Sequence, residues 1–463
     1  MALPSDKLAY SLEKIVGVNH VLTGADVLER FAKDETPNLT PCPADCVVRP
    51  GSTAEVQAVL RYCHEHQIYV TPRGAGTGQS GGCVPIYGGV VMHMERFTKV
   101  HQVDNENLIA KVEPGVITGE FQGTVEEEGL FYPPDPASLS YCTLGGNVAE
   151  NAGGPRALRY GVTREYVLGL EAILADGTFV STGKQTVKGV AGYDLTALLC
   201  GSEGTLAVIT GMTLKLLPKP RCVQTALAVF PSSEHAARVV AAILRAGVIP
   251  RTLEYMDQTC IEAVQAHGAP YRFPVGAGAA LILETDGDDE ESTFATLERA
   301  IECSQKEGAV EVLMAQDEAQ RRKIWQSRRL LSEATRKIRN HKMSEDIVVP
   351  RSRIPEMVAK VGSLGEKHGI RTCAFGHAGD GNLHVQMLFD DDDERLHVLE
   401  MIGELFALTV EMGGTITGEH GVGIAKRDYL PLEQSKPVLD LQRSIKKAFD
   451  PAGILNPGKI FKP

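Results

Sequence analysis

The sequence predicts an α+β protein with more than one domain. Its 463 residues exceed one ordinary hydrophobic core, and this length favours roughly three domains. Strand-like segments alternate with amphipathic helical patterns from Thr225 to Glu307, which is typical of a layered α+β domain. A dense glycine-rich loop at 74–82 lies between two strand-like segments in the first half. These features predict an N-terminal ligand-binding half followed by a separate α+β part.

The overall composition is that of a globular protein without a membrane span. Apolar residues make up 43% and charged residues 23% of the chain. The net charge of -12 argues against nucleic acid as a partner. No apolar run approaches the roughly 18 residues that span a bilayer, and the charged start at 1–10 lacks a secretory pattern. Ten scattered cysteines without cluster spacing predict a reduced, cytoplasmic protein without its own iron–sulfur cluster.

The glycine-rich loop predicts an anion site. The strand-like segment 68–72 leads directly into 73–82, where five glycines fall within nine residues. Successive N–H groups of such a loop can point inward and cradle a phosphate. The classical dinucleotide fingerprint fits poorly, because a strand-like segment at 89–94 follows where that motif requires a helix. A flexible linker is less favoured, since the loop lies between two strands of one domain.

Three further glycine- or amide-rich segments follow, at 132–136, 145–154 and 188–206. Each one alone is most simply an ordinary turn. Their density within about 130 residues of the chain, together with the first loop, instead favours one extended polar ligand lined by backbone donors and acceptors.

The sequence pattern changes after Pro220, where the second half begins. Strand-like residues 225–230 and 279–284 alternate with helix-like residues 232–246 and 291–307. A charged helix is predicted from Gln316 to Asn340, and it carries the only tryptophan, Trp325, with Arg328 three residues on. An arginine on such a helix is usually solvated. We expect this half to form an α+β cap.

The segment from 373 to 427 carries the most chemistry. An apolar alternation ends at Phe375, Asp380-Gly381 supplies a reversal, and a second alternation follows, which predicts a β-hairpin. Across this turn His377 and His384 can converge, whereas on one strand residues seven apart face opposite sides. With the carboxylate of Glu419 they would form a site for a divalent transition metal. The plainer interpretation is that each histidine is an ordinary residue at a strand end.

These motifs together resemble those of one flavoprotein family. Residues 72–78 with 80–82, 146–147 with 151–154, and 201–206 resemble the FAD domain of vanillyl-alcohol-oxidase-type flavoproteins. The sequences Gly-His-Ala-Gly-Asp-Gly-Asn-Leu-His at 376–384 and Gly-Glu-His-Gly-Val-Gly at 418–423 resemble its glycolate oxidase and D-lactate dehydrogenase branch, as does Asn-Pro-Gly-Lys at 456–459. The resemblance extends from about Pro43 to Phe461.

The resemblance implies three parts and a bound FAD. It implies a two-subdomain FAD-binding domain at 1–219, an α+β substrate cap with a metal site at 220–430, and a helical segment at 431–463 that returns to the FAD domain. Relatives that attach FAD covalently carry a histidine in place of Thr77, so a non-covalent FAD is expected. The residues implied to bind it are Arg73, Gly74, Ala75, Gly76, Thr77, Gly78, Ser80, Gly81, Pro134, Asp135, Gly145, Gly146, Asn147, Asn151, Ala152, Gly153, Gly204 and Asn456.

The resemblance also assigns roles to the residues of the second half. Arg328, in Trp-x-x-Arg, would bind the substrate carboxylate, with the hydroxyl of Ser332 one turn on. Zinc, iron or manganese would be held by His377, His384 and Glu419, and His420 would act as the base. A lysine that contacts the distal carboxylate in D-2-hydroxyglutarate enzymes aligns with Ser344, which favours D-lactate or glycolate, although Lys342 is close in sequence.

The expected function is oxidation of a D-2-hydroxy acid by FAD. Because no cluster-type cysteines are present, an iron–sulfur subunit or an electron-transfer flavoprotein is expected to accept the electrons. The protein is expected to be cytoplasmic, or held at the membrane surface through that partner. The alternatives are a zinc hydrolase that uses the His/His/Glu group and a non-catalytic FAD-binding subunit of a larger redox complex. The presence of Glu419 and His420 argues against the latter.

Overall fold

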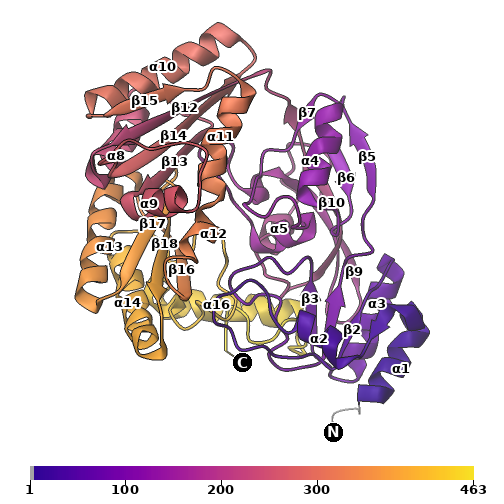
Figure 1. Cartoon of the computed structure of the whole chain (residues 1–463). Helices are drawn as coiled ribbons and strands as arrows, with labels where there is room; N and C mark the ends of the chain where they lie inside the picture. The colour runs from indigo at the N-terminus through magenta and orange to yellow at the C-terminus, as the bar shows by residue number, and fades with distance from the viewer. Residues whose placement is uncertain (1–4, 463) are drawn as a thin grey trace. The chain divides into compact units, whose positions relative to one another are not determined.

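The computed structural model describes residues 5–462, which form two compact units (Figure 1). The first unit comprises residues 5–152, 162–219 and 419–462. The second comprises residues 153–161 and 220–418. The first unit is therefore interrupted twice along the chain, and the short excursion at 153–161 belongs to the second unit.

The first unit begins with a small sheet, and the glycine-rich loop lies between two of its strands, β3 and β4. Its strand order is β1-β2-β4-β3, with β2, β4 and β3 parallel and β1 antiparallel. Helices α1 and α3 pack on it, and Ser52 caps α3 by accepting a hydrogen bond from the N–H of Glu55. The elements are α1 (Ser5–Val16), β1 (Val21–Leu22), α2 (Ala25–Phe31), β2 (Cys46–Val48), α3 (Thr53–Glu65), β3 (Val70–Arg73) and β4 (Val90–His93).

A second sheet of the first unit is entirely antiparallel. Its strand order is β5-β6-β10-β8-β9, so β10 at its centre comes from late in the N-terminal half. The strands are β5 (Val100–Asp104), β6 (Ile109–Val112), β8 (Val167–Ile173), β9 (Phe179–Gly183) and β10 (Val208–Lys215). A small pair, β7 (Leu130–Phe131) and β11 (Leu217–Pro218), and the helices α4 (Thr118–Glu127), α5 (Leu144–Glu150) and α7 (Leu195–Leu199) complete this part.

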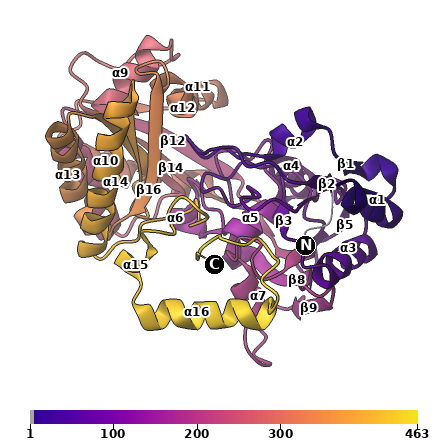
Figure 2. The same cartoon turned by 90° about the horizontal axis from the view of Figure 1, so that it is seen from below.

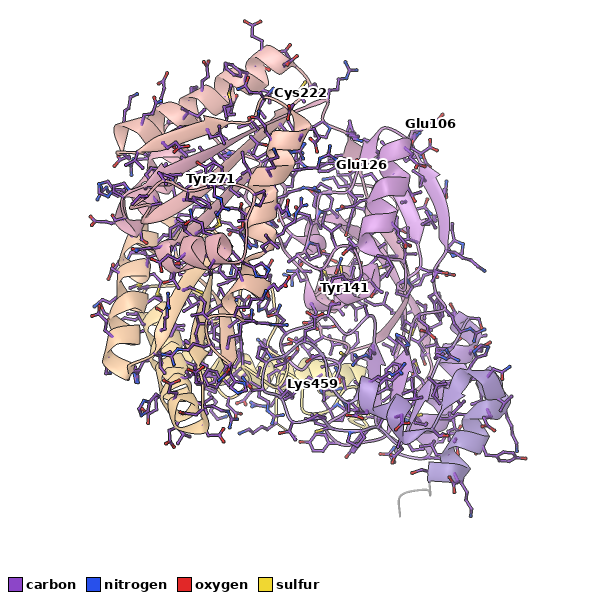
Figure 3. All side chains as sticks on the ribbon, in the orientation of Figure 1. Glu106, Glu126, Tyr141, Cys222, Tyr271 and Lys459 are labelled. Atoms are coloured by element: carbon purple, nitrogen blue, oxygen red, sulfur yellow. The ribbon has the colours of Figure 1, made fainter. Side chains whose placement is uncertain are left out.

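The C-terminal segment, from Glu419 to Lys462, belongs to the first unit. After α15 (Leu430–Glu433) and α16 (Lys436–Phe449), Leu455 forms a parallel bridge with Val70 of β3. The Nζ of Lys459, labelled in Figure 3, donates to the carbonyl oxygen of Val84 at 2.7 Å. Because Val84 lies just after the glycine-rich loop, the end of the chain supports that loop.

The second unit is built on one seven-stranded antiparallel sheet. Its strand order is β15-β12-β14-β13-β17-β18-β16. The strands are β12 (Cys222–Phe230), β13 (Thr252–Asp257), β14 (Ala279–Gly287), β15 (Glu311–Met314), β16 (His341–Val348), β17 (Arg371–His377) and β18 (Asn382–Phe389). The helices are α6 (Ala157–Tyr160), α8 (Ser233–Arg245), α9 (Gln258–Ala266), α10 (Glu290–Lys306), α11 (Glu318–Arg329), α12 (Leu331–Thr335), α13 (Ile354–His368) and α14 (Asp392–Glu411).

The two faces of this sheet differ in chemistry. Helices α8, α10, α13 and α14 form a layer on one face, in which α8 packs between α10 and α13 and α13 packs against α14; Figure 2 shows α10, α13 and α14 on the same side of the sheet. Helices α9, α11 and α12 pack on the other face. Directly opposed residues of antiparallel strands share a face, so Glu254, His377, Phe375, His384 and Asp346 all lie on the face of α9, α11 and α12. This face therefore carries the polar residues of the candidate site.

The predicted helix at 316–340 is wrong in extent. The structure divides it into α11 and α12, which meet at Leu330, and then turns at residues 336–340. Arg328 lies near the end of α11, and Ser332 lies on α12. Ile324 on α11 and Leu331 and Ala334 on α12 are buried in the same apolar cluster as Phe375.

Asp257 caps α9 and provides a pH-dependent contribution to the stability of the second unit. Its carboxylate accepts hydrogen bonds from the N–H groups of Cys260 at 2.8 Å and Ala374 at 2.6 Å. Burial raises the pKa of Asp257 to about 6, although these hydrogen bonds act to lower it. Because the folded pKa lies above the unfolded value, the contribution is fully present below about pH 4 and is lost as the pH rises through about 6.

We therefore expect wild type to lose about 2 kcal/mol relative to Asp257→Asn between pH 4 and 6.5, from a shift of roughly two pKa units. Urea unfolding followed by the fluorescence of Trp325, the only tryptophan, measures this in the second unit. Asp289 is the matched control, since it caps α10 at an exposed position where the N–H of Ser292 lowers its pKa. Asp289→Asn must give the opposite pH trend; the same trend in both variants would contradict the assignment.

Candidate functional site

The two predicted histidines lie side by side in a β-hairpin, as the sequence indicates. β17 and β18 are antiparallel, and His384 lies opposite Phe375. The imidazole centroids of His377 and His384 are 5.3 Å apart and the rings are nearly perpendicular. The turn requires glycine, because a Cβ on Gly381 would lie 2.1 Å from the carbonyl oxygen of Val349, and Gly381 has a φ of +96°.

Glu419 completes a group that could hold a metal. One ligand atom from each of His377, His384 and Glu419 lies within 4.8 Å of the other two. The chain leading to Glu419 is fixed by Asp346, whose carboxylate accepts hydrogen bonds from the N–H of Gly418 at 2.8 Å and the hydroxyl of Thr417 at 3.3 Å. Two imidazoles and a carboxylate suit zinc, iron(II) or manganese, so the donor set fits the expected divalent metal.

Glu254 is a site residue that the sequence analysis missed. It lies on β13 opposite His377 and is 0% exposed. Its carboxylate accepts hydrogen bonds from His377 Nδ1 and, at 2.8 Å, from Arg328 Nε. Burial alone would raise its pKa, but the facing His377 and Arg328 lower the pKa of Glu254 to about 2. The only sequence signal was an acidic residue at an inward position of a largely apolar strand.

The Arg328 side chain is hydrogen-bonded and largely buried, whereas an arginine on a charged helix is usually solvated. Its side chain is 15% exposed, and the guanidinium carbon lies 4.6 Å from the centroid of the Phe375 ring. Apart from Glu254, it makes no hydrogen bond to any residue within the described range 5–462. A guanidinium with two terminal nitrogens left over suits a carboxylate ligand.

Ser332 and Lys342 lie together near this face. The Nζ of Lys342 donates to the hydroxyl oxygen of Ser332 at 3.1 Å and to its carbonyl oxygen at 2.9 Å. Burial, together with the nearby Arg336, lowers the pKa of Lys342 to about 8. Lys342 shares a sheet face with Asp346 four residues on, a separation of about 13 Å along the strand.

The glycine-rich loop of the first unit fits an anion. In the part of the chain that the structure describes, the N–H groups of Ala75, Gly76, Thr77, Gly78 and Gln79 donate to no protein acceptor. Gly76 and Gly81 have φ values of +79° and +74°, and a Cβ on Gly74 would lie 2.3 Å from Thr143 Oγ1. Five consecutive donors on a glycine-lined turn are the arrangement that binds a phosphate.

Arg73 has a different role from the rest of this loop. Its guanidinium folds back within the unit and donates to the carbonyl oxygen of Lys33 at 2.9 Å and to the sulfur of Cys83 at 3.3 Å. The side chain is buried. Its visible contacts therefore support the loop.

Most of the other predicted cofactor residues of the first unit lie on helix α5 or next to Asn456. Thr143 caps α5, which carries Gly145, Gly146 and Asn147, and the amide of Asn147 donates to Thr118 Oγ1 at 2.7 Å. The amide of Asn456 donates at 2.7 Å to the carbonyl oxygens of both Gly82 and Glu203, next to Gly204. Asn151 is left-handed and accepts from the N–H of Arg164. Pro134 accepts from the amide of Gln122, and Ser80 is fully buried.

Two adjacent residues that were predicted to bind the cofactor, Ala152 and Gly153, belong to different units. Ala152 is the last residue of the first of the three segments that form the first unit. Its carbonyl oxygen accepts hydrogen bonds from the N–H and the hydroxyl of Thr163. Gly153 begins the excursion that belongs to the second unit. Asp135 lies in the extended segment after β7. The glycine- and amide-rich motif at 145–154 is continuous in the sequence. It therefore gives no sign that Ala152 and Gly153 belong to different units.

The segment after His420 is anchored within the first unit. The carboxylate of Glu203 accepts hydrogen bonds from the N–H groups of Val422 at 2.8 Å and Gly423 at 2.7 Å. Gly421 has a φ of +81°, a left-handed conformation that favours glycine, and a Cβ there would lie 2.4 Å from Glu150 Oε2. Burial raises the pKa of Glu150 well above its usual value, and the neighbouring Glu203 raises it further. His420 itself is half-buried.

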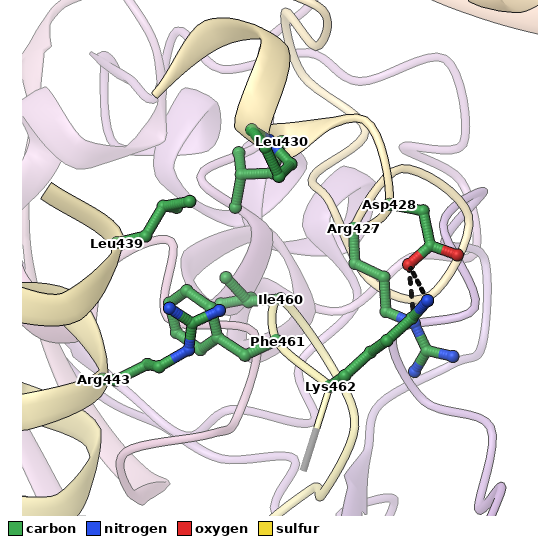
Figure 4. A pocket seen from close by; sticks show the side chains of 9 residues that line it. Arg427, Asp428, Leu430, Leu439, Arg443, Ile460, Phe461 and Lys462 are labelled. Atoms are coloured by element: carbon green, nitrogen blue, oxygen red, sulfur yellow. Dashed lines mark ion pairs between the residues drawn. The ribbon is translucent and has the colours of Figure 1, made fainter. Parts of the chain in front are cut away.

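One surface pocket lies elsewhere in the first unit, between α15, α16 and the chain end. Its volume is about 320 Å³, and Asp428 pairs with Lys462 at 2.8 Å. Figure 4 shows Arg427, Arg443, Phe461 and Lys462 among the side chains that line it. None of the predicted site residues lines it. The pocket therefore adds nothing to the candidate site.

The comparisons with known proteins decide the family. Residues 44–183 match the model of an FAD-binding domain, and residues 219–460 match that of the C-terminal domain of FAD-linked oxidases. The chain belongs to the FAD-linked oxidase family. It is thus an FAD oxidoreductase with mixed helix and sheet, and the five unpaired N–H donors of the glycine loop fit the FAD that this family binds.

The relatives of this FAD-linked oxidase match over nearly the whole chain. It is 43% identical to the glycolate oxidase subunit GlcD of Bacillus subtilis (strain 168), covering 93% of this chain and 92% of that protein. It is 36% identical to a D-lactate dehydrogenase of Anaerostipes hadrus (96% of each chain) and 37% identical to one of Archaeoglobus fulgidus (94% and 96%).

Solved structures share the fold of the FAD-linked oxidase at low identity. p-Cresol methylhydroxylase with bound substrate matches with a TM-score of 0.82 at 19% identity, over 98% of this chain and 96% of that one. The 4-ethylphenol oxidase of Gulosibacter chungangensis matches with a TM-score of 0.80, also at 19% identity, over 100% and 98%. The predicted vanillyl-alcohol-oxidase-type fold is confirmed. No helix within residues 5–462 is long and apolar enough to cross a membrane.

Proposed function

We propose that this FAD-linked oxidase oxidises a short D-2-hydroxy acid, D-lactate or glycolate, to the 2-oxo acid. The observation that carries the proposal is the group of His377, His384 and Glu419, whose ligand atoms lie within 4.8 Å of one another. Glu254 ties His377 of this group to Arg328. A donor set for a metal and a buried, partly unpaired guanidinium suit the hydroxyl and the carboxylate of one small acid.

The residues of the chain divide the work between binding and proton transfer. Arg328 binds the substrate carboxylate through its terminal nitrogens and orients it against the Phe375 ring. His420 accepts the proton of the substrate hydroxyl, and Glu203 holds the backbone that follows it. A divalent metal held by His377, His384 and Glu419 would supply Lewis-acid polarisation of that hydroxyl. FAD, which the glycine loop would hold, would supply the acceptor for the hydride from C2.

The alternatives are less well supported. A zinc hydrolase would not need the FAD-binding domain that the family match covers. A non-catalytic subunit would not need Glu419 and His420 in their present places. We also propose that a separate protein, an iron–sulfur subunit or an electron-transfer flavoprotein, receives the two electrons, because the described cysteines form neither a disulfide nor a cluster-type group.

Replacing Arg328 tests the carboxylate role. Arg328→Met should raise KM for D-lactate roughly 10²-fold, because two charge-assisted hydrogen bonds are lost and about 1.4 kcal/mol corresponds to tenfold. Steady-state kinetics with an artificial electron acceptor measures KM. Arg329→Met is the matched control, since Arg329 is the next residue on α11 and is exposed. An unchanged KM in Arg328→Met, or an equal rise in the control, would remove Arg328 from the carboxylate site.

A further inference from the structure

Glu254 connects the two halves of the candidate site through its two oxygens. Oε2 accepts from Arg328 Nε at 2.8 Å, and Oε1 accepts from His377 Nδ1. Because Glu254 is fully buried on a central strand, its carboxylate cannot move without disturbing the sheet.

The contact with His377 fixes the chemistry of the imidazole. A carboxylate can only accept, so Nδ1 carries the hydrogen and Nε2 carries the lone pair. Nε2 is then the atom available to a metal, and the hydrogen-bonded carboxylate makes it a stronger donor. The strand pairing reinforces this orientation, since Glu254 and His377 are directly opposed residues of β13 and β17.

The contact with Arg328 fixes the guanidinium in the same way. Its Nε edge is held by Glu254, and one of its faces lies over the Phe375 ring. An edge contact and a face contact together determine the plane of the guanidinium. The two terminal nitrogens then point in one direction, which sets where a substrate carboxylate can bind.

We propose that Glu254 is a positioning residue that fixes the span between the carboxylate-binding Arg328 and the metal-binding His377, and thereby selects acids whose hydroxyl is on the carbon next to the carboxylate. This rests on the proposed function of the site. One rigid carboxylate between the two groups leaves the span no freedom to lengthen by a carbon. A 3-hydroxy acid, with one more carbon between hydroxyl and carboxylate, therefore fits poorly.

The neighbouring strand offers a matched control. Glu284 on β14 is also a buried carboxylate, opposite Thr252 on the same sheet face. It pairs with Arg251, Arg321 and the indole N–H of Trp325, and among the described residues it forms no hydrogen bond or ion pair with His377 or Arg328. Glu284→Gln thus removes the same charge from the same sheet without touching the proposed coupling.

The test uses the full-length protein with FAD and compares wild type, Glu254→Gln, Glu254→Asp and Glu284→Gln. The first readout is the Kd for Zn²⁺ of substrate-free protein, by competition with a fluorescent chelator. Glu254→Gln should weaken Zn²⁺ binding about 10–100-fold, while Glu284→Gln stays near wild type. Glu254→Asp keeps the charge but is too short to reach both partners, so it should also bind Zn²⁺ more weakly than wild type.

The second readout is specificity, as the ratio of kcat/KM for D-lactate to that for D-3-hydroxybutyrate. This ratio should fall about tenfold or more in Glu254→Gln, with the larger part of the change in KM for D-lactate. An unchanged Zn²⁺ affinity in both Glu254 variants, an equal loss in Glu284→Gln, or an unchanged ratio would overturn the proposal. If wild type oxidises no 2-hydroxy acid, the proposed function fails, and the Zn²⁺ readout still decides whether Glu254 orients His377.

Discussion

His420→Ala is expected to slow the reduction of bound FAD by D-lactate by about 10²–10⁴-fold while leaving the flavin content of the protein unchanged. The loss follows from removing the group that takes the hydroxyl proton as C2 gives up its hydride. The fold should persist, because Glu203 holds the backbone N–H groups of Val422 and Gly423, which the substitution leaves in place.

Stopped-flow absorbance of the flavin under anaerobic conditions measures this rate directly. His397→Ala serves as the matched control, since His397 is an exposed histidine on α14 outside the candidate site. A rate within twofold of wild type in His420→Ala would remove His420 as the base. A loss of flavin together with activity would instead assign the residue to cofactor binding.

His384→Ala is expected to abolish the bound metal and to lower turnover about 10³-fold or more. The imidazole is one of three neighbouring ligands, so its removal leaves two donors for an ion that takes at least three protein ligands in catalytic sites. Lewis-acid polarisation is worth several kcal/mol, and each 1.36 kcal/mol corresponds to tenfold in rate.

Metal content by atomic absorption, beside flavin content from absorbance, separates the two cofactors. His341→Ala is the control, because His341 lies on the neighbouring strand β16 and stacks on Phe389. It should keep both metal and flavin. A full complement of metal in His384→Ala, or wild-type turnover after complete removal of metal by a chelator, would refute the metal site.

Local patterns in the sequence predicted the parts of the site that are contiguous in the chain. The Asp380-Gly381 reversal between two alternating segments indicated the hairpin that brings His377 and His384 together. The glycine density at 74–82 indicated an anion cradle between two strands, and β3 and β4 do flank it. Both predictions depend on backbone geometry that only glycine permits, and such geometry is visible in the sequence.

The supporting residues could not be predicted because their partners are distant in the sequence. Glu254 meets Arg328 across 74 residues and His377 across 123 residues. Asp346 fixes Gly418 from 72 residues away. These contacts depend on the order and register of the seven-stranded sheet, in which β13 pairs with the distant β17 as well as with β14, the next strand in sequence. Periodicity specifies which face a residue occupies but not which strand lies beside it.

Local sequence patterns also could not predict where the helices and the two units begin and end. The charged stretch 316–340 has helical composition throughout, yet α11 ends at Arg329, α12 covers only Leu331–Thr335, and the chain then turns at 336–340. The excursion at 153–161 leaves the first unit because Arg159 and Tyr160 bind the buried Asp286 of the second unit's sheet. That carboxylate is more than 120 residues away along the chain.

The most direct test of the account is anaerobic mixing of the purified, metal-loaded protein with a panel of D- and L-2-hydroxy acids, including D-lactate, glycolate and D-2-hydroxyglutarate. Flavin absorbance is followed before and after chelation of the metal. The account predicts bleaching by D-lactate or glycolate, little by the L-acids, a weaker response to the dicarboxylate, and loss of the response on chelation. Flavin that stays oxidised with every acid, or bleaching that is indifferent to both configuration and metal, would contradict it.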